Sequence, residues 1–309
     1  MKKTISILTP TYNEAENIEK LCLDISNEMK KMNYEYEHII IDNCSTDNTI
    51  PIIKKIAEKD KRVKIIINSK NFGIIRSPTY GIMQTSGDAV IYMNADFQDP
   101  VELIPKYIKK WEEGAKIVLG EKISSKENSF IFSLRKIFYY IINKISDIDL
   151  TQNTTGSGIF DKKIVDYIKK IDDPYPYFRG LLSELGYTIE TIKFDQPKRL
   201  HGSSKNSFFI LYDYAMLGIV KHSRLPLRLM TIIGFVTSIL SILVALAFFI
   251  YKLFYWNSFE LGIAPLIIGI FGIGSIQIFL LGLIGEYVGV LLIHARKLPM
   301  VIEKERINF

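Results

Sequence analysis

The sequence predicts an α/β domain with a mostly parallel sheet in residues 1–228, followed by two membrane-spanning helices. Short apolar, β-branched runs alternate with amphipathic stretches, which is typical of α/β domains. Two long uncharged runs lie near the C-terminus, and each can cross a bilayer core of about 30 Å as a helix. The strand-like runs are Ile5–Leu8, His38–Ile41, Val63–Ile67, Ala89–Met93 and Lys116–Leu119. The first helical stretch carries apolar residues on one face, at Ile18, Leu21, Cys22, Ile25, Met29 and Met32.

The overall composition conceals an uneven distribution of apolar residues. The chain has 309 residues, 48% apolar and 23% charged, with a net charge of +6, and these totals are ordinary for a soluble domain. The mean hydropathy of +0.14 nevertheless indicates that apolar residues are concentrated in part of the chain. Abundant core-forming residues and only two cysteines exclude a disordered chain or a disulfide scaffold. Cys22 and Cys44 have no metal-ligand spacing and are expected to be small, reduced, buried residues.

The two uncharged runs, Leu229–Tyr251 and Leu261–Gly285, predict a transmembrane hairpin within residues 229–293. The alternative, two helices buried in a soluble core, is disfavoured because the runs follow one another so closely. The N-terminus leads directly into a strand-like run, so no signal peptide is expected. By the positive-inside rule, the domain and the tail at 294–309 face the cytoplasm. The basic residues that flank the hairpin are Lys221, Arg224, Arg228, Arg296, Lys297, Lys304 and Arg306.

Polar clusters follow three of the predicted strands. They are Thr9–Glu14, Asp42–Asp47 and Asn94–Pro100. The carboxyl ends of parallel strands meet at one edge of a sheet, where α/β domains bind their ligands, so these clusters predict a single site. Helix capping is the alternative for Asn13, Asp47 and Asp99, and Asp99-Pro100 in particular predicts the start of a helix.

Four motifs resemble, in order, those of the inverting family-two glycosyltransferases: Pro10–Glu14, Asp42–Asp47, Asn71–Gly73 and Asn94–Pro100. The resemblance is closest to the polyisoprenyl-phosphate branch and extends over essentially the whole chain. It implies a Rossmann-like GT-A domain that binds a nucleotide sugar, followed by the two-helix transmembrane hairpin. The donor-binding residues that the resemblance implies are Pro10, Tyr12, Asn13, Glu14, Asp42, Asn71, Asn94 and Asp96.

The resemblance also implies a Mg²⁺ or Mn²⁺ ion on the donor diphosphate. Asp96 is then the main protein ligand, completed by Gln98 and Asn94. Two positions depart from the family pattern. The aspartate-x-aspartate motif begins with Asn94, and the usual aspartate pair after the second strand is Asp42-Asn43. An amide oxygen is a weaker ligand for such an ion than a carboxylate.

The acceptor side is assigned to residues near the membrane. Residues 129–146 and 207–222 mix aromatic and basic side chains, which favours interfacial helices over core helices. The family's Arg-x-x-Gly-x-Ser-Lys pattern is matched by Arg199, Ser204 and Lys205, which predicts a phosphate cradle, with Arg135 as a further contact. A solvated basic loop attracted to anionic lipid is the alternative. Residues 173–180 are expected to form an acceptor-side loop whose individual roles stay open.

The resemblance, together with the predicted hairpin, implies an inverting transferase that moves a sugar from a nucleotide sugar, a UDP-hexose being favoured, to undecaprenyl phosphate at the plasma membrane. The acceptor phosphate is largely dianionic at neutral pH, so it needs no general base. Asp96, Arg199 and Lys205 are the predicted catalytic residues, acting by charge neutralisation. Nucleic acid is not an expected partner, because the excess positive charge flanks the hairpin.

Two other functions are weighed against this one. A processive polysaccharide synthase would carry a Gln-x-x-Arg-Trp motif, but neither Trp111 nor Trp256 follows an arginine. A non-catalytic, membrane-anchored nucleotide-sugar-binding protein is the second alternative. Gly285 and Gly289 have the spacing of a helix-pairing motif, which would suit a homo-oligomer, and ordinary packing within the hairpin is the alternative. Gly156-Ser157-Gly158 lacks the dinucleotide fingerprint and is expected to be a loop.

Overall fold

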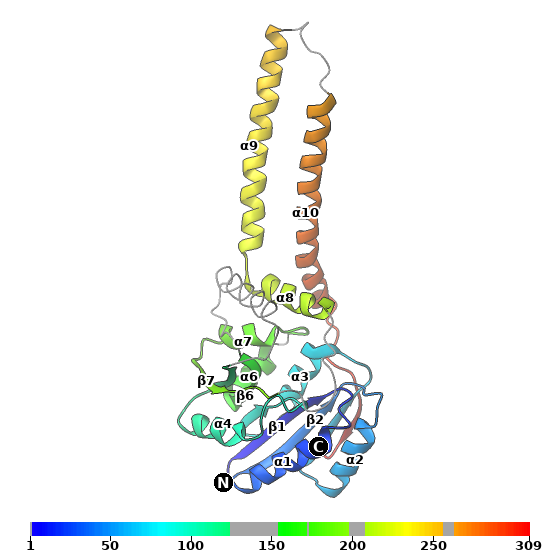
Figure 1. Ribbon diagram of the computed structural model, residues 1–309, viewed down its shortest axis with the longest axis vertical. Helices are drawn as coiled ribbons and strands as arrows, with labels where there is room; N and C mark the ends of the chain where they lie inside the picture. The colour runs from blue at the N-terminus through cyan, green and yellow to red at the C-terminus, as the bar shows by residue number, and fades with distance from the viewer. Residues whose placement is uncertain (1, 124–153, 172, 198–207, 256–262) are drawn as a thin grey trace.

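The computed structural model describes residues 2–123, 154–171, 173–197, 208–255 and 263–309. Within them, one sheet of eight strands is covered by helices on both faces, and two long helices project from the domain (Figure 1). The strands are β1 (Thr4–Thr11), β2 (Glu35–Asp42), β3 (Val63–Asn68), β4 (Ala89–Tyr92), β5 (Ile117–Lys122), β6 (Thr154–Asp161), β7 (Ile189–Phe194) and β8 (Glu303–Ile307). The helices are α1 (Ile18–Lys30), α2 (Thr49–Lys59), α3 (Gly73–Met83), α4 (Leu103–Glu112), α6 (Lys162–Ile171), α7 (Phe178–Glu184), α8 (Phe208–His222), α9 (Leu225–Phe254) and α10 (Ile263–Ala295).

The strand order is β7-β5-β6-β4-β1-β2-β3-β8, and all five predicted strands, β1 to β5, belong to this sheet. β3, β2, β1 and β4 are parallel neighbours, whereas β6 and β8 run antiparallel to the strands beside them. The sheet is therefore mixed, with a parallel centre. The chain runs outward from β1 to β2 and β3 and then crosses back to β4 on the other side of β1, which makes the β1/β4 junction a topological switch point.

The predicted loop at Gly156-Ser157-Gly158 is wrong, because these residues lie inside β6. Gly158 pairs with Tyr92 on one side and with Leu119 on the other. A Cβ atom on Gly158 would lie 2.1 Å from the carbonyl oxygen of Val118. The glycine therefore allows β5 to approach β6 closely.

Two apolar layers hold the helices to the sheet. Alternate strand residues point to opposite faces, so Ile5 and Ile7 join one layer while Leu8 joins the other. Helices α1, α2 and α4 cover the first face, and α3, α6 and α7 cover the second. The predicted apolar face of α1 is confirmed. Its Cys22 is buried, and burial, reinforced by Glu19, raises the pKa of the thiol to about 12. Cys44 is only partly buried.

The last residues of the chain return to the domain and form β8 at the edge of the sheet. β8 pairs antiparallel with β3, and Ile302 O accepts a hydrogen bond from Ser69 N at 2.9 Å. Glu305 bonds Lys54 of α2 at 2.6 Å, and Tyr80 of α3 donates to Glu303 at 2.8 Å. The segment after α10 is therefore an integral part of the α/β domain.

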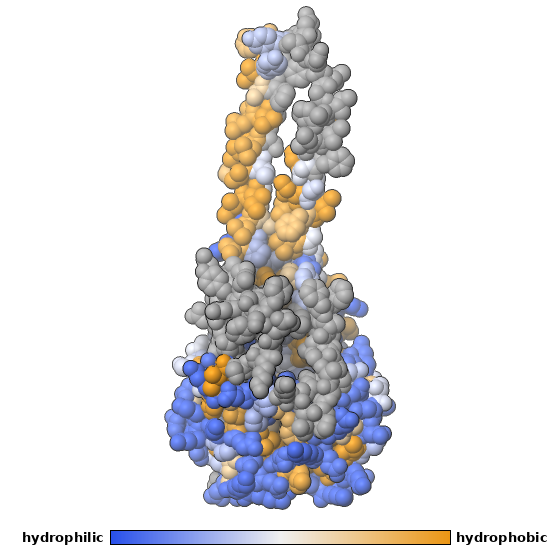
Figure 2. Space-filling view, viewed as in Figure 1, coloured by the Kyte–Doolittle hydropathy of each residue, from blue (hydrophilic) through white to orange (hydrophobic). Residues whose placement is uncertain are grey.

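Helices α9 and α10 are long and apolar enough to span a membrane, by length and composition. They stand clear of the domain side by side (Figure 1), and their described surface is strongly hydrophobic (Figure 2). The apolar stretches that qualify as spans bury none of their length against the rest of the described chain. A Cβ atom added at Gly285 or Gly289 would meet no other described atom within 4 Å.

A buried carboxylate at the amino ends of the strands ties β2 to its neighbours. Glu37 accepts hydrogen bonds from Ser6 Oγ at 2.5 Å and Ser86 N at 2.8 Å, and it pairs with Lys64 at 2.6 Å. Burial alone would raise the pKa of Glu37. The hydrogen bonds from Lys64, Ser6 and Ser86 outweigh that effect and hold the pKa below its ordinary value of 4.5.

Replacing Glu37 by alanine is expected to lower the free energy of unfolding by about 3–5 kcal/mol, because it leaves Lys64 and two hydroxyl donors without their acceptor. The contribution of Glu37 should be fully present above pH 4.5 and fade as the pH falls through its lowered pKa. Melting curves of wild type and Glu37→Gln between pH 3 and 7 measure this pH-dependent contribution of Glu37 to stability. Parallel pH profiles for the two proteins would contradict the assignment.

Candidate functional site

The polar clusters after β1, β2 and β4 lie at one edge of the sheet. Pro10 pairs with Ile41 and Leu8 with Tyr92, so the carboxyl ends of these three strands are adjacent. Each cluster also contains one residue with a left-handed backbone. Asn13, Cys44 and Phe97 have φ values of 56°, 65° and 59°. Such conformations cost energy in non-glycine residues and concentrate at ligand-binding sites.

Hydrogen bonds join the loop after β1 to the loop after β2. Asn13 N donates to Ser45 Oγ at 2.8 Å, and Asn13 Oδ1 accepts from Thr46 N at 2.7 Å. Glu14 N donates to Thr49 Oγ1 at 2.8 Å. Asn13 and Glu14, both predicted donor-binding residues, therefore hold the two loops together. Of the other two predicted donor-binding residues, Pro10 is the second-last residue of β1 and Tyr12 follows the strand, and both are half-buried.

Asp42 is fully buried at the end of β2. Its carboxylate accepts hydrogen bonds from Thr11 Oγ1 at 3.1 Å, Ser45 N at 2.8 Å and Ser45 Oγ at 2.5 Å. Burial raises the pKa of Asp42, Asp47 adds to the increase, and the bonds from Ser45 and Thr11 partly offset it. In this structure Asp42 shapes the turn that begins the second cluster.

Asn43 connects the second cluster to the predicted Asn71 motif. Its Oδ1 accepts from Asn68 Nδ2 at 3.0 Å and from Phe72 N at 2.8 Å. Its Nδ2 donates to Asn71 Oδ1 at 2.8 Å and to Gly73 O at 3.2 Å. An amide donates and accepts at once, which an ionised carboxylate does not do. The departure from an aspartate pair therefore follows from a local network, and sequence reasoning missed this role.

Replacing Asn43 by aspartate is expected to destabilise the protein by about 1–3 kcal/mol and to raise KM for the sugar donor. The new carboxylate would lose both donated bonds and face the oxygens of Asn71 and Gly73. Protonation of the new carboxylate restores one donor, so the loss of stability should be smallest below about pH 4, near the ordinary pKa of an aspartate, and should grow as the pH rises. Melting temperature and donor KM measure the two effects. Wild-type values of both would show that the network does not hold the loop.

The cluster after β4 forms one turn that contains all three predicted metal ligands. Gln98 N donates to Asp96 Oδ1 at 3.1 Å. Asn94 Oδ1 accepts from the Tyr92 hydroxyl at 3.0 Å, and Asn94 Nδ2 donates to Asp99 Oδ2 at 2.8 Å. An aspartate at position 94 would place a second carboxylate against Asp99, and like charges at that distance repel. The amide of Asn94 replaces that repulsion with a hydrogen bond.

The predicted helix start at Asp99-Pro100 is wrong, because α4 begins at Leu103. Asp99 is buried and accepts the hydrogen bond from Asn94. Its side chain therefore organises the turn after β4.

The chemistry of this turn fits a hard divalent cation that is shared with a substrate. No group of three or more His, Cys, Asp or Glu side chains in the described residues could hold a metal ion without further ligands. Asp96 offers a carboxylate, and Asn94 and Gln98 offer amide oxygens. Mg²⁺ typically takes one or two carboxylates, keeps several waters and completes its shell with substrate phosphates. A nucleoside diphosphate would supply those phosphates.

The predicted acceptor cradle lies outside the described residues, as does the helix expected at 129–146. The four residues concerned are Arg135, Arg199, Ser204 and Lys205. At the second expected position, 207–222, the structure has a helix, α8, and its location at the membrane interface stays a prediction. Of the acceptor-side loop, residues 178–180 begin α7, which packs between the sheet and α8.

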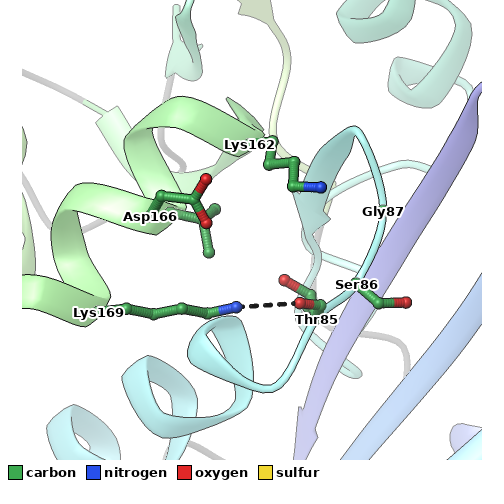
Figure 3. Close-up of a pocket in the computed structure, with 7 residues that line it drawn as sticks. Thr85, Ser86, Gly87, Lys162, Asp166 and Lys169 are labelled. Atoms are coloured by element: carbon green, nitrogen blue, oxygen red, sulfur yellow. Dashed lines mark hydrogen bonds between the residues drawn. The ribbon is translucent and has the colours of Figure 1, made fainter.

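A polar cavity of about 310 Å³ lies at the opposite edge of the sheet, where β4 begins. Lys162, Asp166 and Lys169 line it from α6, and Thr85–Gly87 line it from the facing loop (Figure 3). Lys169 Nζ donates to Thr85 O at 3.2 Å. This cavity is separated from the strand-end site by the length of β4.

Comparison with known proteins identifies the family to which the chain belongs. Residues 6–168 match the model of the family described as Glycosyl transferase family 2. A glycosyltransferase of Synechocystis sp. is 32% identical over 92% of this chain and 90% of its own length. The SfII prophage-derived bactoprenol glucosyl transferase of Shigella flexneri is 30% identical over 97% of both chains.

Among solved structures, glucosyl-3-phosphoglycerate synthase from Mycobacterium tuberculosis, in complex with Mn²⁺, uridine diphosphate and phosphoglyceric acid, gives a TM-score of 0.48. It is 18% identical and covers 71% of this chain and 76% of that one. The family match extends over more than half of the chain, and the relatives align over nearly all of it. The chain therefore belongs to glycosyl transferase family 2, in the branch of the bactoprenol glucosyl transferases.

Proposed function

We propose that this glycosyltransferase moves a hexose from a UDP-sugar to undecaprenyl phosphate, a polyisoprenyl phosphate, at the cytoplasmic face of the plasma membrane. The observation that carries the proposal is the union of two features in one chain. Polar clusters suited to a nucleotide sugar lie at the strand ends beside the β1/β4 switch point, and two helices of membrane-spanning length are joined to the same sheet, the second of them through β8. A relative named as a bactoprenol glucosyl transferase aligns with this chain over 97% of both lengths.

The proposed topology places the α/β domain and both termini on one side of the membrane. Because β8 follows α10 and pairs with β3, the chain leaves the domain and returns to it. Two crossings, by residues 229–251 and 261–285, are consistent with that path. Basic residues before α9 and after α10 favour the cytoplasmic side. Residues 1–228 then form the catalytic domain and 294–309 its C-terminal strand.

The proposed reaction is an in-line displacement at the anomeric carbon of the donor. An oxygen of the acceptor phosphate attacks that carbon, and the bond from the carbon to the diphosphate oxygen breaks. The electron pair leaves with UDP, and the anomeric centre inverts. A phosphate monoester is largely dianionic at neutral pH, so no side chain has to remove a proton.

In this proposal the protein holds the acceptor phosphate and the donor diphosphate in line on opposite sides of the anomeric carbon. Asp96, with Asn94 and Gln98, would hold Mg²⁺ or Mn²⁺ against the diphosphate, where the ion supplies positive charge to the leaving group. Pro10, Tyr12, Asn13, Glu14, Asp42 and Asn71 would surround the nucleoside. Arg135, Arg199, Ser204 and Lys205 would bind the acceptor phosphate.

The direct test incubates the detergent-solubilised full chain with radiolabelled UDP-hexoses, undecaprenyl phosphate and Mg²⁺. We expect label in the lipid fraction with one donor, as a single sugar per lipid, and none with EDTA or without the lipid. Label that extends into a polymer would identify a processive synthase instead. No labelled lipid with any UDP-, GDP- or dTDP-sugar would refute the proposal.

A further inference from the structure

Helix α7 places a cationic side chain at the end of β4 that the proposed mechanism does not yet use. β6 runs antiparallel to β4, and Gly158 pairs with Tyr92, the last residue of β4. Gly156 therefore lies just beyond the carboxyl end of β4, beside the turn that holds Asn94. A Cβ atom on Gly156 would lie 3.9 Å from Arg179 Nε and 4.0 Å from Arg179 Nη2. The guanidinium of Arg179 is thus at the mouth of the strand-end site.

The guanidinium of Arg179 lies beside the residues that shape the metal turn. Tyr92, whose strand partner Gly158 is two residues from Gly156, donates to Asn94 at 3.0 Å. Asn94 in turn donates to Asp99 at 2.8 Å. The positive charge of Arg179 is therefore at the edge of the sheet where Asp96 and Asp99 create a negative potential.

Close packing fixes α7 to α8. A Cβ atom on Gly180 would lie 2.2 Å from His222 Nε2, so the backbone of α7 rests directly on the imidazole ring. His222 Nδ1 and Glu184 Oε1 are 2.9 Å apart. The ring of Tyr177 lies 5.0 Å from that of Tyr214 on α8. Arg179 lies between these anchors in sequence, so its backbone position is set by α8.

Ion pairs and hydrogen bonds then join α8 to the base of both apolar helices. Asp173 pairs with Lys221 of α8 at 2.5 Å and with His294 of α10 at 3.0 Å. Tyr287 of α10 donates to Ser223 O, directly before α9, at 3.0 Å. The element that carries Arg179 is therefore held where a lipid headgroup would reach the domain.

We propose that Arg179 binds the phosphate of the lipid acceptor and guides it to the donor site. The inference rests on the proposed function. A phosphate dianion that approaches Asp96 and Asp99 meets like charge, and a cation on the membrane side of that turn removes the repulsion. A guanidinium also binds two phosphate oxygens in one plane, which fixes the direction of attack. Arg179 then adds one contact, from the described part of the chain, to the cradle predicted at Arg199 and Lys205.

The test compares Arg179→Gln and Arg179→Lys with wild type in the full, detergent-solubilised chain. We expect Arg179→Gln to raise KM for undecaprenyl phosphate by about 10- to 100-fold, the effect of losing a charged hydrogen-bond partner. Arg179→Lys keeps the charge but loses the planar pair of guanidinium donors. Its KM for undecaprenyl phosphate should therefore lie between the values of wild type and Arg179→Gln. KM for the UDP-sugar, and the Kd for UDP measured by calorimetry, should stay within about 2-fold of wild type. Lys162→Gln, in the cavity at the far edge of the sheet, is the matched control and should change none of these values.

Other outcomes would overturn the inference. A tenfold weaker UDP affinity with an unchanged lipid KM would assign Arg179 to the donor diphosphate. Wild-type values of both constants would show that Arg179 binds neither anion. If Arg179→Gln lost its cooperative melting transition, the lysine variant would decide the question. Failure of the proposed function would be distinct, because the wild type itself would then transfer no sugar to the lipid.

Discussion

Replacing Asp96 by asparagine is expected to lower kcat by about 10³-fold while leaving the melting temperature within about 2 °C of wild type. The fold should persist because asparagine keeps the Oδ1 atom that accepts the hydrogen bond from Gln98 N at 3.1 Å. Turnover should fall because the substitution removes the carboxylate assigned to the cation. Loss of charge stabilisation worth several kcal/mol corresponds to about three powers of ten in rate.

Two comparisons separate this effect from a general loss of negative charge. Asp166→Asn removes an exposed carboxylate at the far edge of the sheet and should leave kcat unchanged. Titration of Mg²⁺ or Mn²⁺ should require a higher concentration for half-maximal rate in Asp96→Asn than in wild type. A variant with wild-type kcat and wild-type metal dependence would show that the turn after β4 does not hold the ion.

The parts of the fold that could be predicted from sequence are those with a strong local pattern. The first five strands are runs of β-branched residues, and α1 presents an apolar stripe at helical spacing. β6 lacks such a pattern, because two glycines interrupt its apolar residues. In the structure Gly158 lets β5 come close enough to pair with β6. Four of the five residues of β8 are charged, so its place is visible only in the structure, from its pairing with β3 and its contacts with Lys54 and Tyr80.

The same distinction holds for the candidate site. Asp42 and Asp96 could be placed at one edge of the sheet because parallel strands direct their carboxyl ends together. The role of Asn43 depends on four hydrogen bonds to a segment 25 to 30 residues away, which no local pattern encodes. Arg179 is one arginine among many in the sequence. Only the register of β6 and the packing of α7 on α8 bring it to the end of β4.

Ending the chain after Ile302 is expected to lower the melting temperature by about 10–20 °C. The deletion removes β8 and Asn308, whose side chains form hydrogen bonds with the rest of the domain. The partners that lose these bonds are Lys54 and Ala57 of α2, Tyr80 of α3, Gln84 at the end of α3, and Val63 of β3. At about 1 kcal/mol each, five such bonds contribute about 5 kcal/mol. One kcal/mol shifts the melting temperature of a domain this size by about 2–4 °C.

The truncation should also cause aggregation, because it leaves the edge of β3 without a partner along its isoleucine run, Ile65–Ile67. Size-exclusion chromatography in detergent measures this effect alongside the melting curve. Lys304→Ala, which changes one exposed side chain of the strand and keeps its backbone, is the matched control and should behave as wild type. A truncated chain that melts within 2 °C of wild type and stays monodisperse would show that β8 adds no stability. The expected result would mean that the sheet and α10 fold as one cooperative unit. The sheet is complete only when β8, which follows α10 in the chain, has paired with β3.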